Sequence, residues 1–140
     1  MKKCLFSGLL FIVFCCMAEL NITAQVPHRM IIPDIAGYLT LKGDMHIHTA
    51  FSDGSVWPTT RVDEAYMEGL DFIALTDHID ERLQKQKKAG LMNNDRNDSY
   101  KIAAARGKDC GVLVIHGGEI SRGMPPGHFN TTFIHDGNAI

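Results

Sequence analysis

The sequence has little cysteine for disulfides or thiolate metal sites. Of its 4 cysteines, Cys4, Cys15 and Cys16 lie in the apolar first segment of the chain. Cys110 is then left without a cysteine partner, so the remainder cannot form an internal disulfide or a thiolate-rich zinc site. We expect Cys110 to be an ordinary packing residue.

The sequence also lacks a strong charge of one sign. It has 14 basic and 16 acidic residues, a formal net charge of −2 and no block of Lys or Arg. This balance gives no electrostatic footprint for a nucleic acid or an anionic membrane surface. A hydrophobic content of 45% with 21% charged residues excludes a disordered tail and a coiled coil and predicts one globular domain at most. The 7 histidines are the unusual feature.

The apolar run at residues 5–17 is too short to cross a bilayer, and Lys2 and Lys3 precede it. This pattern, with Ala24 at a plausible cleavage point, predicts a signal peptide over residues 1–24 and export to the periplasm or the exterior. A retained membrane anchor is the alternative. Residues 25–38 then form an extended lead-in, and the domain covers residues 39–140.

The domain alternates strand patterns with helix patterns. Strands are expected at 43–48, 72–75, 112–115 and 129–133, and helices at 58–69, with Thr60 as its cap, and at 99–108. The charged stretch 79–97 is expected to be a surface excursion with one exposed helix. Apolar runs that follow helices are typical of parallel strands buried on both faces, so the order predicts a parallel α/β sheet.

Metal-ligating residue types gather where these strands end. His46 and His48 lie two apart on a strand, so their side chains leave the same face. His78 and Glu119 end the next two strands. With Asp53 in the first loop and His128 at the fourth strand, the six form one candidate rim. Imidazole with carboxylate suits Zn, Mn or Fe, and six ligands exceed one tetrahedral shell.

Each of these residues also has a simpler interpretation. A His-x-His pair is often ordinary polar surface, Asp53 is a turn residue by default, and His78 can be a capping or buried histidine. Their conjunction favours the metal site. We expect His116 to be structural and His28 and His135 to lie on the surface.

The residues around this rim resemble a known family. The sequence Asp-x-His-x-His-Thr at 44–49, the Ser-Asp-Gly turn at 52–54, the segment at 69–78 ending in Thr-Asp-His, and Gly-Glu-Ile at 118–120 look like the first three motifs of the PHP (polymerase and histidinol phosphatase) domain. The resemblance covers residues 42–130. The segment at 127–130, in an exported chain, is most similar to secreted bacterial phosphodiesterase-like members.

The resemblance implies a distorted (β/α)7 TIM-like barrel that holds two or three divalent metals and hydrolyses phosphomono- or phosphodiesters with a metal-activated hydroxide. It implies that His46 and His48 hold the first metal and that Glu119 bridges to the second. Asp53 and His78 would hold the third.

Three further roles follow from the same resemblance. His128 would join the second metal, and Asp77 would orient His78 or a bound water from behind the metals. Arg122 is a candidate contact for a phosphate oxygen. No protein nucleophile is expected.

Several alternatives stay open. The family's later Asp-x-His motif is not in these 140 residues, so we expect an N-terminal portion of the barrel, as a fragment or an inactive remnant. An amidohydrolase-type metal hydrolase is the second enzyme class, and a metal-stabilised scaffold is a non-catalytic interpretation. The partner expected is a small phosphate-ester substrate, with no specific nucleic acid and no permanent membrane anchor. The natural substrate and the oligomeric state do not follow from the sequence.

Overall fold

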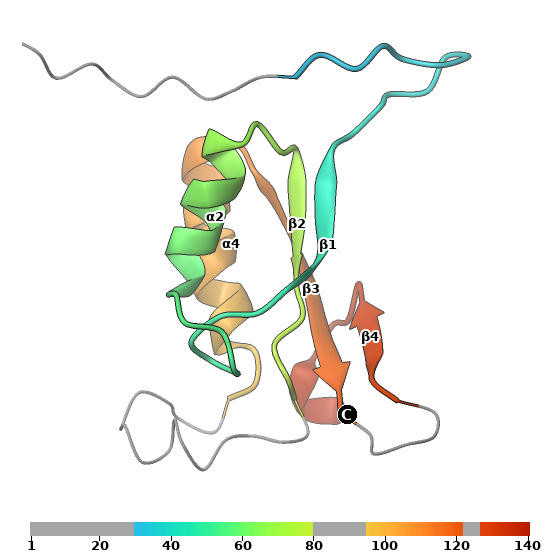
Figure 1. Ribbon diagram of the computed structural model, residues 1–140. Coiled ribbons are helices and arrows are strands. Elements are labelled where there is room, and N and C mark those ends of the chain that lie inside the picture. Colours follow the sequence, from blue (N-terminus) through green and yellow to red (C-terminus); the bar gives the residue numbers. More distant parts are fainter. Residues whose placement is uncertain (1–29, 80–94, 122–126) are drawn as a thin grey trace, which may run out of the picture.

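The computed structural model describes residues 30–79, 95–121 and 127–140. Its strands are β1 (Gly43–Ile47), β2 (Phe72–Leu75), β3 (Leu113–Ile120) and β4 (Phe129–Thr132), and its helices are α2 (Pro58–Met67), α4 (Asp98–Cys110) and the short 3-10 helix η2 (Gly137–Ala139) (Figure 1). The predicted signal peptide and the predicted exposed helix of the 79–97 excursion lie outside the described residues. None of the helices described is both long and apolar enough to cross a membrane.

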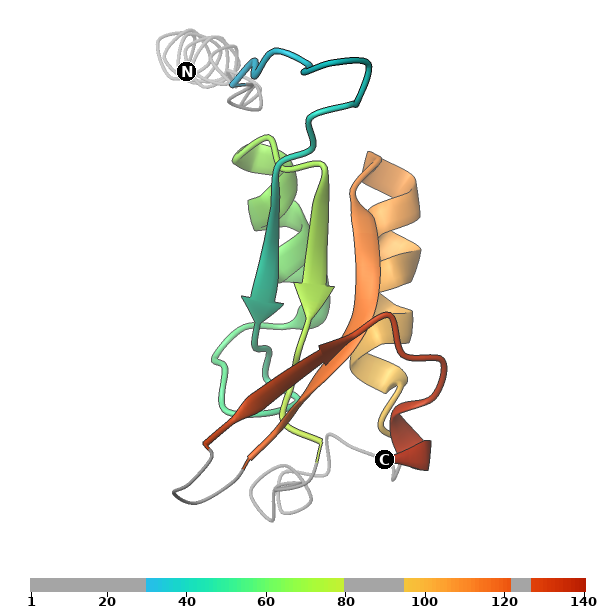
Figure 2. The ribbon, with the colours of Figure 1, turned by 90° about the vertical axis from the view of Figure 1, so that its right-hand side faces the viewer.

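The four strands form one sheet in the order β1-β2-β3-β4, and the first three run parallel. Both helices cover the same face of this sheet (Figures 1 and 2). The core lies between these helices and the sheet. It consists of small and branched side chains: Val62, Ala65, Ile73, Leu75, Ala103, Val112 and Val114. The predicted mixed α/β architecture is confirmed, and the curled sheet is consistent with part of a TIM-like barrel.

Helix α2 begins at Pro58, as expected, but its N-cap is not the residue that the capping pattern indicated. Its first residue is Pro58 and its N-cap is Trp57, which makes no side-chain capping hydrogen bond, so the predicted Thr60 cap is wrong. Proline fixes φ near the helical value and has no N–H to satisfy, which favours a start at this residue. The helix ends at Met67, and Gly69 follows it with φ of 71°.

Strand β3 extends past its predicted end at residue 115, through His116 and two glycines, to Ile120. A Cβ on Gly117 would lie 2.7 Å from the carbonyl oxygen of Thr131 and 2.8 Å from that of Leu75. Only glycine lets both neighbouring strands approach β3 this closely. The extension carries Glu119 into the strand.

Strand β4 pairs with β3 in the antiparallel sense, with Glu119 opposite Asn130 and Ile120 opposite Phe129 (Figure 2). The start of β4 therefore lies beside the end of β3. His128, just before β4, thus lies at the same rim as the carboxyl ends of the parallel strands. The sequence pattern predicted this position but did not indicate the direction of β4.

The last residues return to the start of α4. Asn97 donates its side-chain amide to Asp136 at 2.8 Å and accepts from the backbone N–H of Gly137 at 2.7 Å. These bonds hold the first turn of α4 beside the rim, where Ser99 enters the site described below.

Candidate metal centre

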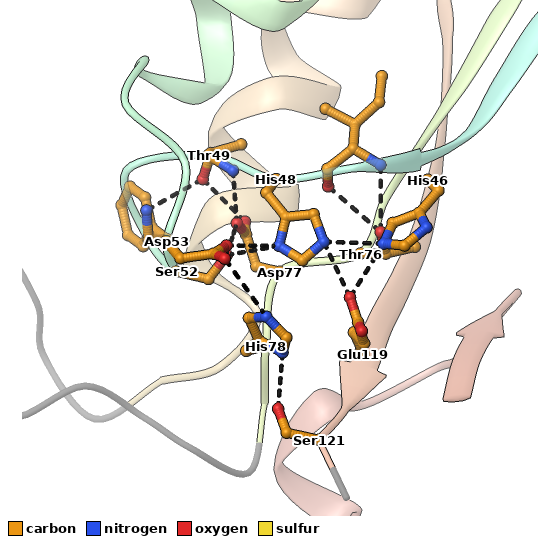
Figure 3. A network of polar contacts seen from close by, with 12 residues as sticks. His46, His48, Thr49, Ser52, Asp53, Thr76, Asp77, His78, Glu119 and Ser121 are labelled. Atoms are coloured by element: carbon orange, nitrogen blue, oxygen red, sulfur yellow. Dashed lines mark hydrogen bonds and ion pairs between the residues drawn. The ribbon is translucent and has the colours of Figure 1, made fainter. Parts of the chain in front are cut away.

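His46 and His48 converge at the end of β1. Their Nε2 atoms lie 2.8 Å apart, and each is 2.9 Å from Oε2 of Glu119 (Figure 3). The β1–β2 register shifts between Asp44 and Ile47, and such irregularities re-aim side chains at the ends of strands. Two imidazole nitrogens and a carboxylate oxygen thus meet at one point, a donor set that fits a small divalent cation.

Backbone pairing brings Glu119 and His78 together from neighbouring strands. The bridge between His78 and Glu119 extends the parallel β2–β3 ladder, with the N–H of Ile79 donating to the Glu119 carbonyl at 2.9 Å. The N–H of Glu119 donates to the Asp77 carbonyl at 3.0 Å. Because the ladder is parallel, both side chains lie at the carboxyl rim. The Glu119 side chain is only 4% exposed there.

Two further groups of ligand types adjoin the first. The carboxylate of Asp53 lies 2.8 Å from His48 Nδ1 and 3.6 Å from His78 Nε2. On the other side, His128 Nδ1 lies 2.5 Å from Oε1 of Glu119. Within the described residues, the three groups able to hold an ion share members: His46, His48 and Glu119; His48, Asp53 and His78; His78, Glu119 and His128. The structure thus brings together all six residues that the sequence nominated as ligands, and their ligation remains a prediction.

The histidines set the charge of the two carboxyl groups. Burial raises the pKa of Glu119, but hydrogen bonds from His46 and His128 and the nearby charges of His78 and His48 lower it further than burial raises it. Burial also raises the pKa of Asp53, and the charge of His48 is the largest effect that brings it below its ordinary value. Both groups are therefore ionised at neutral pH, as metal ligation requires.

Asp77 ties the loop after β1 to the end of β2. Its carboxylate accepts from the backbone N–H of Thr49 at 2.6 Å, from Thr49 Oγ1 at 2.8 Å and from Ser52 Oγ at 2.7 Å (Figure 3). It also accepts from Ser99 Oγ. All four residues are at most 8% exposed. The sequence pattern assigned a role in the site to Asp77 alone. Thr49 and Ser52 stand in the motifs at 44–49 and 52–54 without a role there, and Ser99 was only the expected start of a helix.

Two other contacts fix the histidines of the rim. Ser121 Oγ lies 2.7 Å from Nδ1 of His78, which leaves Nε2 of that ring on the side of Asp53. Arg61, from α2, donates its Nε–H to the backbone carbonyl of His48 at 3.0 Å. Neither Ser121 nor Arg61 stands in a spacing that would have singled it out in the sequence.

The two other histidines that the structure describes, His116 and His135, belong to none of the ligand groups at this centre. His116 is buried in β3 and stacks on Tyr100 with ring centroids 4.2 Å apart, and burial lowers its pKa. It belongs to none of the ligand groups found in the described residues, in agreement with its predicted structural role. His135 is exposed, while His28 and Arg122 lie outside the described residues.

The chain is similar to several known proteins. The chain is similar to the crystal structure of a two-domain protein from Bacteroides vulgatus ATCC 8482 that contains a predicted PHP-like metal-dependent phosphoesterase, with 49% identity and a TM-score of 0.72 over 81% of this chain and 32% of that chain. It is also 37% identical over 83 residues to a 5'-3' exoribonuclease of Haemophilus influenzae, which is 59% of this chain and 24% of that protein.

An amidohydrolase of Chromobacterium violaceum is similar at 25% identity and a TM-score of 0.47, over 64% of this chain and 26% of that chain. No protein-family model matches the chain. The chain spans about a third of the Bacteroides structure and a quarter of the exoribonuclease. The resemblance to PHP-like proteins that the motifs indicated is thus supported by a solved structure.

Proposed function

We propose that this chain carries part of the active site of a metal-dependent phosphoesterase that hydrolyses phosphomono- or phosphodiesters. The observation that carries the proposal is the sharing of Glu119 and His78 between adjacent ligand groups at one rim. Shared ligands would hold cations close together. Closely spaced cations stabilise both the attacking and the leaving oxygen of a phosphate ester during its hydrolysis.

The residues fit two or three divalent cations, with Zn or Mn as our choice and Fe as the alternative. His46, His48 and Glu119 would hold the first, Glu119 and His128 the second, and Asp53 and His78 the third. Such cations polarise phosphate oxygens and activate water as the nucleophile. The ligand atoms are imidazole nitrogens and carboxylate oxygens, which suit these metals.

The protein holds the ligand side chains in place at the rim and leaves space for a substrate beside them. The buried Glu119 concentrates negative charge between the histidines, and the 49% exposed side chain of His46 keeps one side open to solvent. A surface hollow of about 390 Å³ adjoins the rim, lined by His46, His48, Asp44 and Arg61 among others, and has the size of a small-ligand site. Arg122 is proposed as a further phosphate contact.

The remainder of the architecture is also part of the proposal. We propose that the described sheet is the N-terminal portion of a distorted (β/α)7 barrel, supported by the match to 81% of this chain within 32% of the longer Bacteroides structure. The exoribonuclease relative makes short RNA one of the phosphodiesters worth testing.

A paired assay of the purified full-length protein tests the proposed reaction. We expect it to hydrolyse a chromogenic phosphomonoester or phosphodiester, to lose that activity on treatment with a chelator, and to regain it with Mn²⁺ or Zn²⁺. The reason is that the proposed reaction depends on bound cations to polarise the phosphate oxygens. A 5'-phosphorylated RNA and a panel of amides and lactones complete the substrates. Metal-dependent hydrolysis confined to amides or lactones would replace this proposal with an amidohydrolase.

We also propose that the protein is exported. The support is the Lys2-Lys3 pair before the apolar run and the small residues near Ala24. Cell fractionation followed by N-terminal sequencing should find the protein outside the cytoplasm with its N-terminus near residue 25. A cytoplasmic protein that retains Met1 would contradict export, and a membrane-bound one that retains Met1 would favour the anchor.

A further inference from the structure

The hollow beside the rim has its positive charge at one end. Among the described residues that line the hollow, Arg61 is the only Lys or Arg, and His46 and His48 line it as well. The Nε–H of Arg61 donates to the backbone carbonyl of His48 at 3.0 Å. Arg61 therefore lies at the end of the hollow that adjoins the candidate metal centre.

Two hydrogen bonds hold the Arg61 guanidinium in one orientation. Besides the bond to the His48 carbonyl, Nη1 of Arg61 donates to Oε2 of Glu64 at 2.8 Å. A guanidinium has five N–H groups, so three remain, and no hydrogen bond to a described residue uses them. The side chain is 30% exposed. A ligand oxygen in the hollow can therefore accept from a group that has already lost most of its rotamer freedom.

The acidic groups of the hollow are either paired or distant from this end. Glu64 is bound to Arg61 itself. Asp44 stands four residues before His48, which corresponds to about 13 Å along an extended strand. Glu68 stands seven residues after Arg61, about 10 Å along a helix. An anion is therefore attracted to the Arg61 end of the hollow and repelled from the opposite end.

We infer that Arg61 is a substrate-binding residue that donates hydrogen bonds to a phosphate oxygen of an ester held at the His46–His48 side of the rim. This inference rests on the proposed function as a phosphoesterase. The planar fork of an arginine can give two parallel hydrogen bonds to one phosphate, and such charge-assisted bonds are stronger than neutral ones. The bond to the His48 carbonyl keeps this fork next to the candidate metal ligands.

Calorimetric titration of the Mn²⁺-loaded full-length protein with inorganic phosphate tests the contact directly. Arg61→Gln should bind phosphate about 10- to 100-fold more weakly than wild type, because a hydrogen bond between charged groups is lost. Arg61→Lys keeps the charge but not the fork, so it should recover part of the affinity. Glu64→Gln should bind phosphate about 2- to 5-fold more tightly, because its carboxylate no longer offsets the guanidinium charge.

The matched control is Arg106→Gln. Arg106 forms the same kind of ion pair, with Asp63 at 2.7 Å, and is not among the residues that line the hollow. Elemental analysis of the same samples gives the Mn²⁺ content of each variant. If Arg61 served only to hold the His48 backbone, Arg61→Gln would lose Mn²⁺, while the protein that stays loaded would bind phosphate as tightly as wild type. That result, or equal phosphate affinities of Arg61→Gln and Arg106→Gln, would overturn the inference.

Steady-state kinetics with a chromogenic phosphomonoester separates this inference from the proposed function. Arg61→Gln should raise KM by a similar factor and change kcat less, because a phosphate oxygen is held in both the ground state and the transition state. A lower kcat with unchanged KM would count against the contact. A wild-type protein that binds phosphate through Arg61 but hydrolyses no phosphate ester would refute the proposed function and leave the contact standing. A wild-type protein that binds no phosphate would overturn the inference.

Discussion

Glu119→Gln is expected to remove at least one divalent cation from the full-length protein. One carboxyl oxygen of Glu119 meets Nε2 of His46 and His48, and the other meets Nδ1 of His128, so this side chain stands between two centres. Glutamine keeps the shape but offers one neutral oxygen where two anionic ones stood. The loss of affinity should exceed the roughly 10- to 100-fold change that follows loss of an outer partner of a ligand.

Elemental analysis of the purified variants measures this effect. Glu68→Gln is the matched control, because it makes the same chemical change on the exposed end of α2. His48→Ala should lower the metal content less than Glu119→Gln, since His48 serves one ion. Unchanged stoichiometry in both Glu119→Gln and His48→Ala would refute the ligand assignment.

Asp77→Ala is expected to lower the free energy of unfolding of the metal-free protein by about 3–5 kcal/mol, because it strands several buried donors at once. The hydroxyls of Thr49, Ser52 and Ser99 and the N–H of Thr49 all donate to this carboxylate. Each buried donor left without an acceptor costs about 1–3 kcal/mol, and water that enters the vacated space recovers part of the sum.

The free energy of unfolding is measured by urea denaturation, with Asp63→Ala as the control. This control gives the effect of removing an aspartate that does not bind buried donors. Asp63 on α2 accepts from Arg106 at 2.7 Å, but its side chain is 49% exposed. An exposed pair of this kind contributes about 0.2–1 kcal/mol. Equal losses in the two variants would show that Asp77 does not hold the loop to β2.

The sequence predicted the strands, and which side chains gather at their ends, because both follow local rules. Alternation along a strand placed His46 and His48 on one side, and the apolar runs before His78 and Glu119 identified strand ends. A parallel sheet then required those ends to meet at one rim. The structure brings these side chains within a few ångströms of one another, with His46 2.9 Å from Glu119.

The supporting contacts could not be predicted because they join distant segments through ordinary residues. Ser99 is 22 residues from Asp77 and opens a helix whose placement depends on how α4 packs across the sheet. Ser121 follows a strand whose length depends on how closely its neighbours approach Gly117. Nor did the sequence indicate that β4 is antiparallel, since the residue pattern of a short strand does not depend on its direction.

That direction of β4 has a consequence for how the rim assembles as the chain folds. Glu119 and His128 are 9 residues apart, whereas Glu119 and His46 are 73 apart. The longer segment is about three doublings of loop length longer than the shorter one. Bringing its ends together therefore costs about 2 kcal/mol more in chain entropy. We therefore expect the β3–β4 side of the rim to gather its ligands first. The His46–His48 side is completed only when β1 and β2 join the sheet.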